Sequence, residues 1–256
     1  MRSETGSPPA GAPDGLGRGD GRWRPRRGSA PGLAHLLSRG TWHPLGARPD
    51  RCAYRVDTPA GPFFAKHYAP GSLAGRWRDF ALRRKPQRAF ARGLALAEGG
   101  VATARPLGLF SRGGPLWHQA LLVLEWLDGA EPWERCLSGG AADAPVLEAL
   151  AATLGGLHRR GLYHGDLPAN LVAAGGERGL LRVYVVDLED LKRGLGRRRR
   201  VKNLEELGRR APGLAVRRQG AFLQAYCREA GLERSAARIL WRQCRRRRSR
   251  IGRGGR

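Results

Sequence analysis

The stretch that decides the fold is YHGDLPANLV at residues 163–172, which is followed by VVDLED at residues 185–190. The first places an Asp after His-Gly and an Asn shortly beyond it, and the second places another Asp at the end of an apolar run. Phosphoryl transfer needs one carboxylate to orient or deprotonate a hydroxyl, and an amide and a second carboxylate to hold magnesium. The two stretches therefore predict a kinase-like phosphotransferase site.

Composition indicates a folded protein with some disordered length. Hydrophobic residues make up 41% of the 256 positions, enough for one substantial core or two small lobes, while 38 glycines and 17 prolines favour disordered segments. No run approaches the roughly 20 apolar residues that cross a bilayer. Residues 1–5, MRSET, are not followed by the apolar segment of a secretory signal. We therefore expect a cytoplasmic protein.

The cysteines and the net charge limit the partners. No C-x-x-C spacing occurs, so we expect isolated reduced thiols rather than a zinc site or a disulfide framework. The net charge of +25 comes almost entirely from arginine, since only four of the 47 basic residues are lysine. This charge predicts anionic partners, whether nucleic acid, acidic lipid or a phosphorylated glycan, and does not choose among them.

The pattern of apolar residues predicts the following elements. A disordered tail covers residues 1–30, and a β-hairpin covers residues 51–68 with its turn at 58–61. Lys66 lies there on an otherwise apolar strand face, where a lone cation needs an anionic partner. Further elements are a helical region at 76–98 broken near Pro86, strands at 106–110, 120–127, 171–173 and 181–186, a helix capped by Asp143, and basic helices beyond 200.

The order of these parts is that of a protein-kinase-like fold. A strand with Lys is followed by a helix, a buried strand, a second helix, a His-x-Asp loop and a hairpin that ends in Asp. Within that group the chain resembles the lipopolysaccharide kinase family, which phosphorylates Kdo or heptose in the inner core of lipopolysaccharide. The resemblance runs from about residue 50 to 215. It rests on FFAK at 63–66, GVATARPL at 100–107, LYHGDL at 162–167, VDLED at 186–190 and RRRRVKNL at 197–204.

The resemblance implies an α+β fold with two lobes, a small β-rich N-lobe at about 40–125 and a reduced helical C-lobe at about 130–245. The kinase-like domain would then span 31–245, with a basic tail at 246–256. It also implies roles for individual residues. Lys66 would pair with the α- and β-phosphates of ATP, Asp166 would accept or orient the proton of the sugar hydroxyl, and Asn170 and Asp187 would hold Mg²⁺. Backbone groups from Glu125 to residue 127 would contact the adenine.

Several positions depart from the protein-kinase pattern. The loop from Asp166 to Asn170 is one residue shorter, and the missing position is where protein kinases commonly place a phosphate-binding Lys. Gly165 replaces the Arg that reads activation-loop phosphorylation, and no G-x-G-x-x-G precedes Lys66. Glu98 is the candidate for the Glu that pairs with Lys66. The arginines at 197–200 are either a solvated face or a binding site for a phosphorylated or carboxylated sugar.

The leading hypothesis is an ATP-dependent sugar kinase that acts on the lipopolysaccharide core glycan. Its polybasic surface would hold it at the anionic inner face of the cytoplasmic membrane as a peripheral protein. A non-catalytic kinase-like binding module is the alternative that the shortened loop suggests. A nucleic-acid-binding protein is the alternative that the charge suggests, although no stacking-aromatic or recognition-helix motif supports specific nucleic-acid binding.

Overall fold

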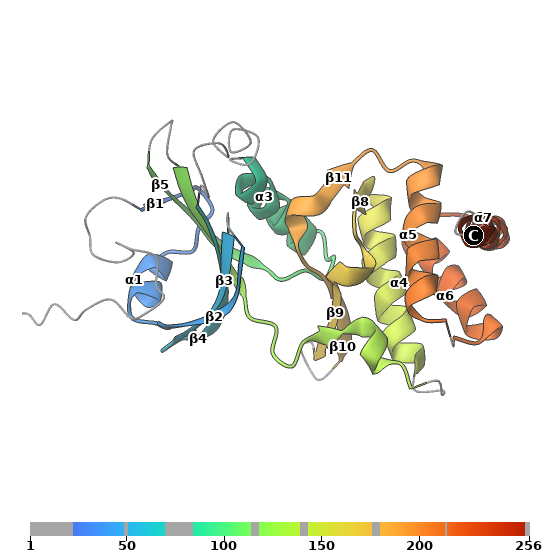
Figure 1. Ribbon diagram of the computed structural model, residues 1–256, viewed down its shortest axis with the longest axis horizontal. Helices are drawn as coiled ribbons and strands as arrows, with labels where there is room; N and C mark the ends of the chain where they lie inside the picture. Colours follow the sequence, from blue (N-terminus) through green and yellow to red (C-terminus); the bar gives the residue numbers. More distant parts are fainter. Residues whose placement is uncertain are drawn as a thin grey trace, which may run out of the picture. The chain divides into compact units, whose positions relative to one another are not determined.

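The computed structural model describes residues 23–48, 51–69, 84–113, 118–138, 143–175, 180–212 and 214–253. The chain divides into two compact units, Met1–Leu94 with Ala104–Trp126, and Ala95–Thr103 with Leu127–Arg256. The longest strands belong to the first unit and most of the helices to the second (Figure 1). The predicted α+β class is confirmed.

The first unit is built on a six-stranded antiparallel sheet with the order β1-β5-β6-β4-β3-β2. The predicted hairpin is confirmed, because the strands before and after the turn pair directly and Thr58 Oγ1 donates a hydrogen bond of 2.8 Å to Gly61 O. The strands are β1 (Arg24–Pro25), β2 (Thr41–Arg48), β3 (Arg51–Thr58), β4 (Gly61–Tyr68), β5 (Pro106–Gly113) and β6 (His118–Glu125).

A short helix, α1 (Leu33–Ser38), supplies apolar residues to the core of this sheet. Trp42 anchors the junction of helix and sheet, since its ring is buried and its Nε1 donates to Leu37 O at 3.2 Å. The buried residues of this core are Leu33, Leu37, Trp42, Val56, Ala65, Phe110, Leu121 and Val123.

The tail predicted at 1–30 is wrong for its last residues. Residues 1–22 lie outside the described part of the chain, but β1 pairs with β5 at the sheet edge, and Trp23 packs against the core. The guanidinium of Arg112 lies 5.3 Å from the centre of the Trp23 ring. A single tryptophan and a free sheet edge thus order a segment whose composition alone indicates disorder.

Helix α3 (Arg84–Glu98) is the described part of the helical region expected at 76–98. Pro86 lies in its first turn, where the missing N–H costs no intrahelical hydrogen bond, so the described helix is not broken there. The helix ends at the predicted place, because Gly100 adopts a left-handed conformation with φ of 73°.

The second unit is organised around α4 (Asp143–Arg159), which packs against α6 (Val216–Glu229) and β10 (Leu181–Val185). Its buried residues surround the helix, as expected for a central helix. Strand β10 belongs to a three-stranded sheet with β9 (Leu171–Gly175) and β7 (Glu131–Pro132), and β8 (Leu162–His164) pairs with β11 (Leu191–Arg193). The strands expected at 171–173 and 181–186 are confirmed.

The predicted capping role of Asp143 is wrong. Asp143 is the first residue of α4, and its carboxylate accepts hydrogen bonds from the backbone and hydroxyl of Ser138 at 2.8 and 3.2 Å. Arg218 of α6 donates to the same carboxylate at 2.6 Å. These contacts hold the pKa of Asp143 below its usual value against the opposing effect of burial. The carboxylate therefore joins α4 to α6 instead of capping its own helix.

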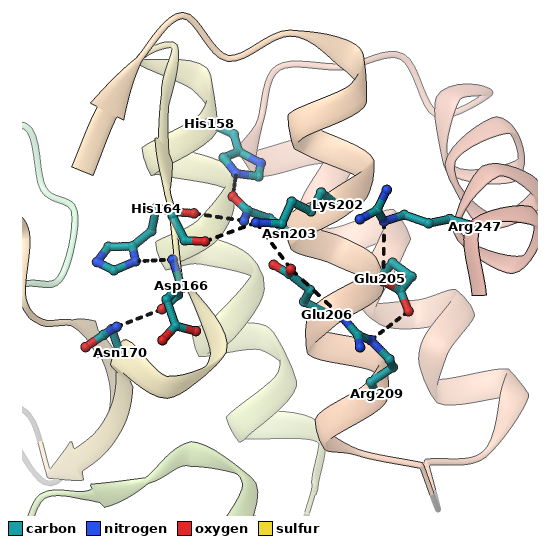
Figure 2. Close-up of polar contacts among 11 residues, drawn as sticks. His158, His164, Asp166, Asn170, Lys202, Asn203, Glu205, Glu206, Arg209 and Arg247 are labelled. Carbon is teal, nitrogen blue, oxygen red and sulfur yellow. Dashed lines mark hydrogen bonds and ion pairs between the residues drawn. The ribbon is translucent and has the colours of Figure 1, made fainter. Parts of the chain in front are cut away.

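Helices α5 (Arg197–Arg210) and α7 (Ala236–Arg253) complete the second unit and pack against each other. One side of α5 is buried, and the tail expected at 246–256 is helical as far as Arg253. Glu205 explains part of this order, because its fully buried carboxylate lies 2.9 Å from Arg209 Nε and 3.5 Å from Arg247 Nε (Figure 2). Within the described ranges, no helix is long and apolar enough to span a bilayer.

Candidate active site

The candidate catalytic loop leaves β8 after His164 and runs to Asn170 at the end of a 3₁₀ turn, η2 (Pro168–Asn170). Leu167 and Pro168 are buried and anchor the loop, while Asp166 is exposed beside them. The Asp166 carboxylate forms no hydrogen bond or ion pair with any described residue. The buried residues thus hold the loop in place, and the loop presents one carboxylate to solvent.

His164 fixes the backbone on both sides of the site. Its ring is fully buried, and Nδ1 accepts a hydrogen bond from Asp166 N at 3.1 Å. Because Nδ1 is an acceptor, the proton of the neutral ring is on Nε2, which donates to Asp187 O at 3.1 Å. One imidazole therefore links the backbones of two carboxylates that the sequence singles out (Figure 2 shows the Asp166 side of this link).

Asn170 closes the shortened loop. Its Nδ2 donates to Asp166 O at 2.7 Å, so the amide folds back onto the loop (Figure 2). Its backbone carbonyl accepts a hydrogen bond of 2.9 Å from Val186 N, the residue before Asp187. The loop is short, yet Asn170 still lies beside the segment that joins β10 to Asp187.

Asp187 has an unusual backbone conformation. Its φ of 53° makes it the one non-glycine residue with positive φ in the described part of the chain. Asp tolerates the left-handed region better than most residues, and such conformations concentrate at functional sites. The turn directs the chain from β10 into η4 (Leu188–Asp190), which leads to β11.

The donor chemistry of Asn170 and Asp187 fits Mg²⁺. Magnesium prefers oxygen ligands and is commonly bound by one or two protein groups together with substrate phosphates and water. Asn170 uses its Nδ2 in the loop, and its Oδ1 accepts no hydrogen bond from a described residue. Among the described residues, no group of three or more His, Cys, Asp or Glu forms a metal site on its own. A site of this kind would be completed by the nucleotide.

A second polar chain lies behind the loop and was not foreseen from the sequence. Arg200 donates to Tyr226 Oη at 2.7 Å, and Tyr226 Oη lies 2.7 Å from His158 Nδ1. His158 Nε2 lies 3.3 Å from Asn203 Oδ1, and Asn203 Nδ2 donates to His164 O at 3.0 Å. One arrangement of protons satisfies every step, with Tyr226 O–H donating to His158 and His158 N–H donating to Asn203.

His158, the histidine in this series of hydrogen bonds, is neutral. Burial lowers the pKa of His158 to about 3, and the positive charge of Arg200 acts in the same direction. Burial also raises the pKa of Tyr226 above its usual value. His158 is buried in the last turn of α4. Its connection through Asn203 to the catalytic loop depends on the tertiary packing of α4, α5 and α6.

The remaining predicted residues are distributed over both units. Lys66 is half-buried on β4, with its Nζ 5.8 Å from the centre of the Tyr68 ring. Glu125 ends β6, where its backbone N–H donates to Arg105 O and its side chain accepts from Arg105 N, both at 2.9 Å. Glu98 is exposed at the end of α3 and belongs to the second unit. The pairing of Lys66 with Glu98 stays a prediction.

Comparisons with known proteins agree with this geometry. The model of the lipopolysaccharide kinase (Kdo/WaaP) family matches residues 86–226. The 3-deoxy-D-manno-octulosonic acid kinase of Stenotrophomonas maltophilia (strain R551-3) is 28% identical over 200 residues, which are 68% of this chain and 79% of that protein. The solved structure of WaaP in complex with acyl carrier protein matches 85% of this chain and 91% of its own with a TM-score of 0.57 and 20% identity. The structural match establishes the fold, and the family model covers more than half of the chain.

Proposed function

The chain belongs to the lipopolysaccharide kinase (Kdo/WaaP) family, and we propose that it transfers the γ-phosphoryl group of ATP to a sugar hydroxyl of the lipopolysaccharide inner core. Family membership makes it a phosphotransferase of lipopolysaccharide synthesis. The use of ATP and Mg²⁺ and the acceptor hydroxyl, on Kdo or on heptose, are the proposed part.

The observation that carries the proposal is the link through His164. A hydroxyl nucleophile needs a carboxylate in a fixed position, and the metal that bridges the phosphates needs a second carboxylate in a fixed relation to the first. His164 bonds the backbones at Asp166 and Asp187 through its two ring nitrogens. Because the ring is fully buried, water does not compete for either bond.

Each residue then has a proposed task. The exposed carboxylate of Asp166 would accept the proton of the sugar hydroxyl or orient that hydroxyl for attack. Asn170 Oδ1 and the carboxylate of Asp187 would hold Mg²⁺, which supplies positive charge to neutralise the charge of the phosphates. Lys66 would bind the α- and β-phosphates, Glu98 would orient Lys66, and the backbone near Glu125 would contact the adenine.

A transfer assay tests the proposal. The protein is incubated with γ-labelled MgATP and a core acceptor that has been dephosphorylated, and label on the glycan is measured for the wild type, Asp166→Asn and Asp190→Asn. Asp190 is an exposed carboxylate of the same unit, so it controls for loss of a negative charge. We expect transfer by the wild type and Asp190→Asn, and a loss on the order of a thousandfold in Asp166→Asn.

Two outcomes would replace the proposal. Retention of MgATP binding without transfer to any core acceptor would favour a kinase-like binding module. Absence of nucleotide binding, with tight and steeply salt-dependent binding of RNA, would favour a nucleic-acid-binding protein.

The proposed place of action is the inner face of the cytoplasmic membrane, to which the protein would bind peripherally. The charge of +25 supports this, as do the exposed arginines on α7, which include Arg245, Arg246 and Arg248. We expect cosedimentation with vesicles that contain an anionic phospholipid and release by salt, because such attraction is screened. Equal binding to zwitterionic vesicles would contradict an electrostatic attachment.

A further inference from the structure

Two of the few lysines converge on the residue before Asp166. Lys202 of α5 donates a hydrogen bond from Nζ to Gly165 O at 3.1 Å. Lys192 of β11 approaches the same residue, since a methyl group placed on Gly165 would lie 3.5 Å from Lys192 Nζ. In a chain where four of 47 basic residues are lysine, two of the four flank a single glycine.

A third cation lies next to this pair. Tyr163 and Lys192 are direct partners across the antiparallel pair β8 and β11, so their side chains lie on the same face. The guanidinium of Arg199 lies 4.6 Å from the centre of the Tyr163 ring, and its NH1 donates to Gly194 O at 2.6 Å. These contacts hold Arg199 in place without neutralising its charge.

In the cluster formed by Lys192, Arg199 and Lys202, one of the three cations has an ion-pair partner among the described residues. Glu206 lies 3.4 Å from Lys202 Nζ and is the acid that pairs with it. In the described part of the chain, neither Lys192 nor Arg199 forms an ion pair, and the first turn of α5 contains no acidic residue. Cations held together without matching anions repel one another, and an anionic ligand would relieve that repulsion.

We propose that Lys192, Arg199 and Lys202 form an anion site that binds a carboxylate or phosphate group of the acceptor glycan beside the hydroxyl directed to Asp166. The inference rests on the proposed kinase function and adds to it the means of recognising the acceptor. The compact ammonium groups of the lysines offer several donors to an oxyanion, and the absent side chain of Gly165 leaves the space in front of Lys192 open.

The position of the cluster favours the acceptor over the nucleotide. Lys192 and Lys202 flank the backbone on the N-terminal side of Asp166. The proposed magnesium ligands follow on the C-terminal side, where Asn170 bonds to Asp166 O. Cations on the N-terminal side would orient the glycan whose hydroxyl meets Asp166, and the metal site on the C-terminal side would bind the phosphates of the nucleotide.

Acceptor kinetics test the site with Lys192→Gln and the conservative Lys192→Arg, because the Lys192 side chain forms no hydrogen bond or ion pair with a described residue that would hold the loop. Arg182→Gln, an exposed arginine on β10 of the same unit, is the matched loss of charge. Each protein is assayed with a Kdo-containing core acceptor that lacks phosphate at the accepting hydroxyl but keeps its other phosphates, with the same acceptor after methylation of its carboxylates, and with the same acceptor after removal of the remaining phosphates.

We expect Lys192→Gln to raise the KM for the acceptor roughly tenfold, the loss of one charge-assisted contact, with the KM for MgATP and kcat little changed. Lys192→Arg should keep most of the affinity, and Arg182→Gln should behave as wild type. For one of the two modified acceptors, the KM of the wild type should rise by the same factor, while the KM of Lys192→Gln should rise little further. The modification that has this effect identifies the group that the site binds. A raised KM for MgATP, a lowered kcat at unchanged acceptor KM, or no change at all would overturn the site.

A binding experiment separates this inference from the kinase function itself. Calorimetric titration of the unmodified core oligosaccharide without nucleotide compares the wild type with Lys192→Gln. If the wild type transfers no phosphate but binds the oligosaccharide at least several-fold more tightly than Lys192→Gln, the anion site stands although the proposed function fails. Equal binding by both proteins, or no binding by either, would overturn the site.

Discussion

The side-chain amide of Asn203 donates a hydrogen bond to the backbone carbonyl of His164, with 3.0 Å between Nδ2 and O. Both residues are almost completely buried, at 1% and 0% exposure. The bond joins α5 to the start of the candidate catalytic loop. The Oδ1 of the same amide interacts with His158 Nε2, and His158 Nδ1 interacts with Tyr226 Oη. We therefore propose that Asn203 positions Asp166 through His164.

Replacing Asn203 with Ala should reduce both stability and turnover. The His164 carbonyl and His158 Nε2 would lose their partners in a buried place, which costs about 2 kcal/mol of unfolding free energy. We expect kcat to fall at least tenfold at saturating substrates, with the KM for MgATP little changed, because the loop is misplaced by a small distance.

The control for this amide deletion is Gln243→Ala on α7. The buried Oε1 of Gln243 has no hydrogen-bond partner among the described residues, so its loss should change neither stability nor turnover appreciably. Chemical denaturation and steady-state kinetics measure the two effects. Wild-type turnover in Asn203→Ala would show that Asn203 stabilises the fold but does not position the loop.

His158 should make the unfolding free energy depend on pH. Its pKa is about 3 in the folded protein and about 6.5 when the chain is unfolded, so between these values the unfolded state binds the extra proton. The resulting stability is fully present above pH 6.5 and falls as pH decreases toward 3. From pH 7.5 to 5.0 the loss is about 2 kcal/mol from this group.

The variant His158→Gln removes that titration and provides the comparison. Its unfolding free energy, measured by urea denaturation, should be lower than that of the wild type at pH 7.5. The difference between the two proteins should narrow at pH 5.0. If both proteins lose the same stability over this range, the buried neutral histidine does not account for the acid sensitivity.

Glu205 should contribute more to stability than the exposed acidic residues of the second unit. Its side chain is fully buried between Arg209 and Arg247, which are 47% and 39% exposed. Glu205→Ala leaves two facing guanidinium groups that still reach water, so we expect a loss of about 2 kcal/mol, less than for a wholly buried pair. Glu233→Ala, at an exposed position, should cost under about 0.5 kcal/mol. Equal melting curves for the two variants would contradict this account.

Gly155 should tolerate no side chain where α4 meets α6. A Cβ at this position would lie 2.4 Å from Glu229 Cβ and 3.0 Å from Ala230 N, so the helices would have to separate. We expect Gly155→Ala to lower the unfolding free energy by about 2 kcal/mol. Gly220→Ala on α6 meets no atom within 4 Å and should be neutral or stabilise by about 0.5 kcal/mol through helix propensity. Thermal unfolding should therefore show changes in stability of opposite sign, or of very different size, for the two variants.

Local patterns were sufficient to predict many elements. The hairpin around the 58–61 turn and the helix that begins near Asp143 depend on neighbours in the sequence, and the structure confirms them. The site motifs also depend on short spacings. Asp166, Asn170 and Asp187 lie in one unit, where the Asn170 side chain donates to Asp166 O and the N–H of Val186, next to Asp187, donates to Asn170 O.

Contacts between distant segments explain what the sequence did not predict. Asp143 does not cap its helix, because its carboxylate binds Arg218, 75 residues further along the chain. Asn203 and Lys202 lie in a stretch whose charges indicate a solvated helix, and their roles appear only when α5 packs behind His164. The arginine run at the C-terminus lacks an apolar pattern, yet Leu240 is buried and Arg247 pairs with Glu205.

The most direct test of the central claim is the single-turnover rate of phosphoryl transfer from MgATP to the core glycan by the wild type, Asp166→Asn and Asp187→Asn. We predict that both variants transfer at least about a thousandfold more slowly. Asp166→Asn should still bind MgATP as the wild type does, while Asp187→Asn should lose the magnesium dependence of nucleotide binding. Transfer by Asp166→Asn at the wild-type rate would contradict the claim that this carboxylate and its link through His164 to Asp187 form the catalytic centre.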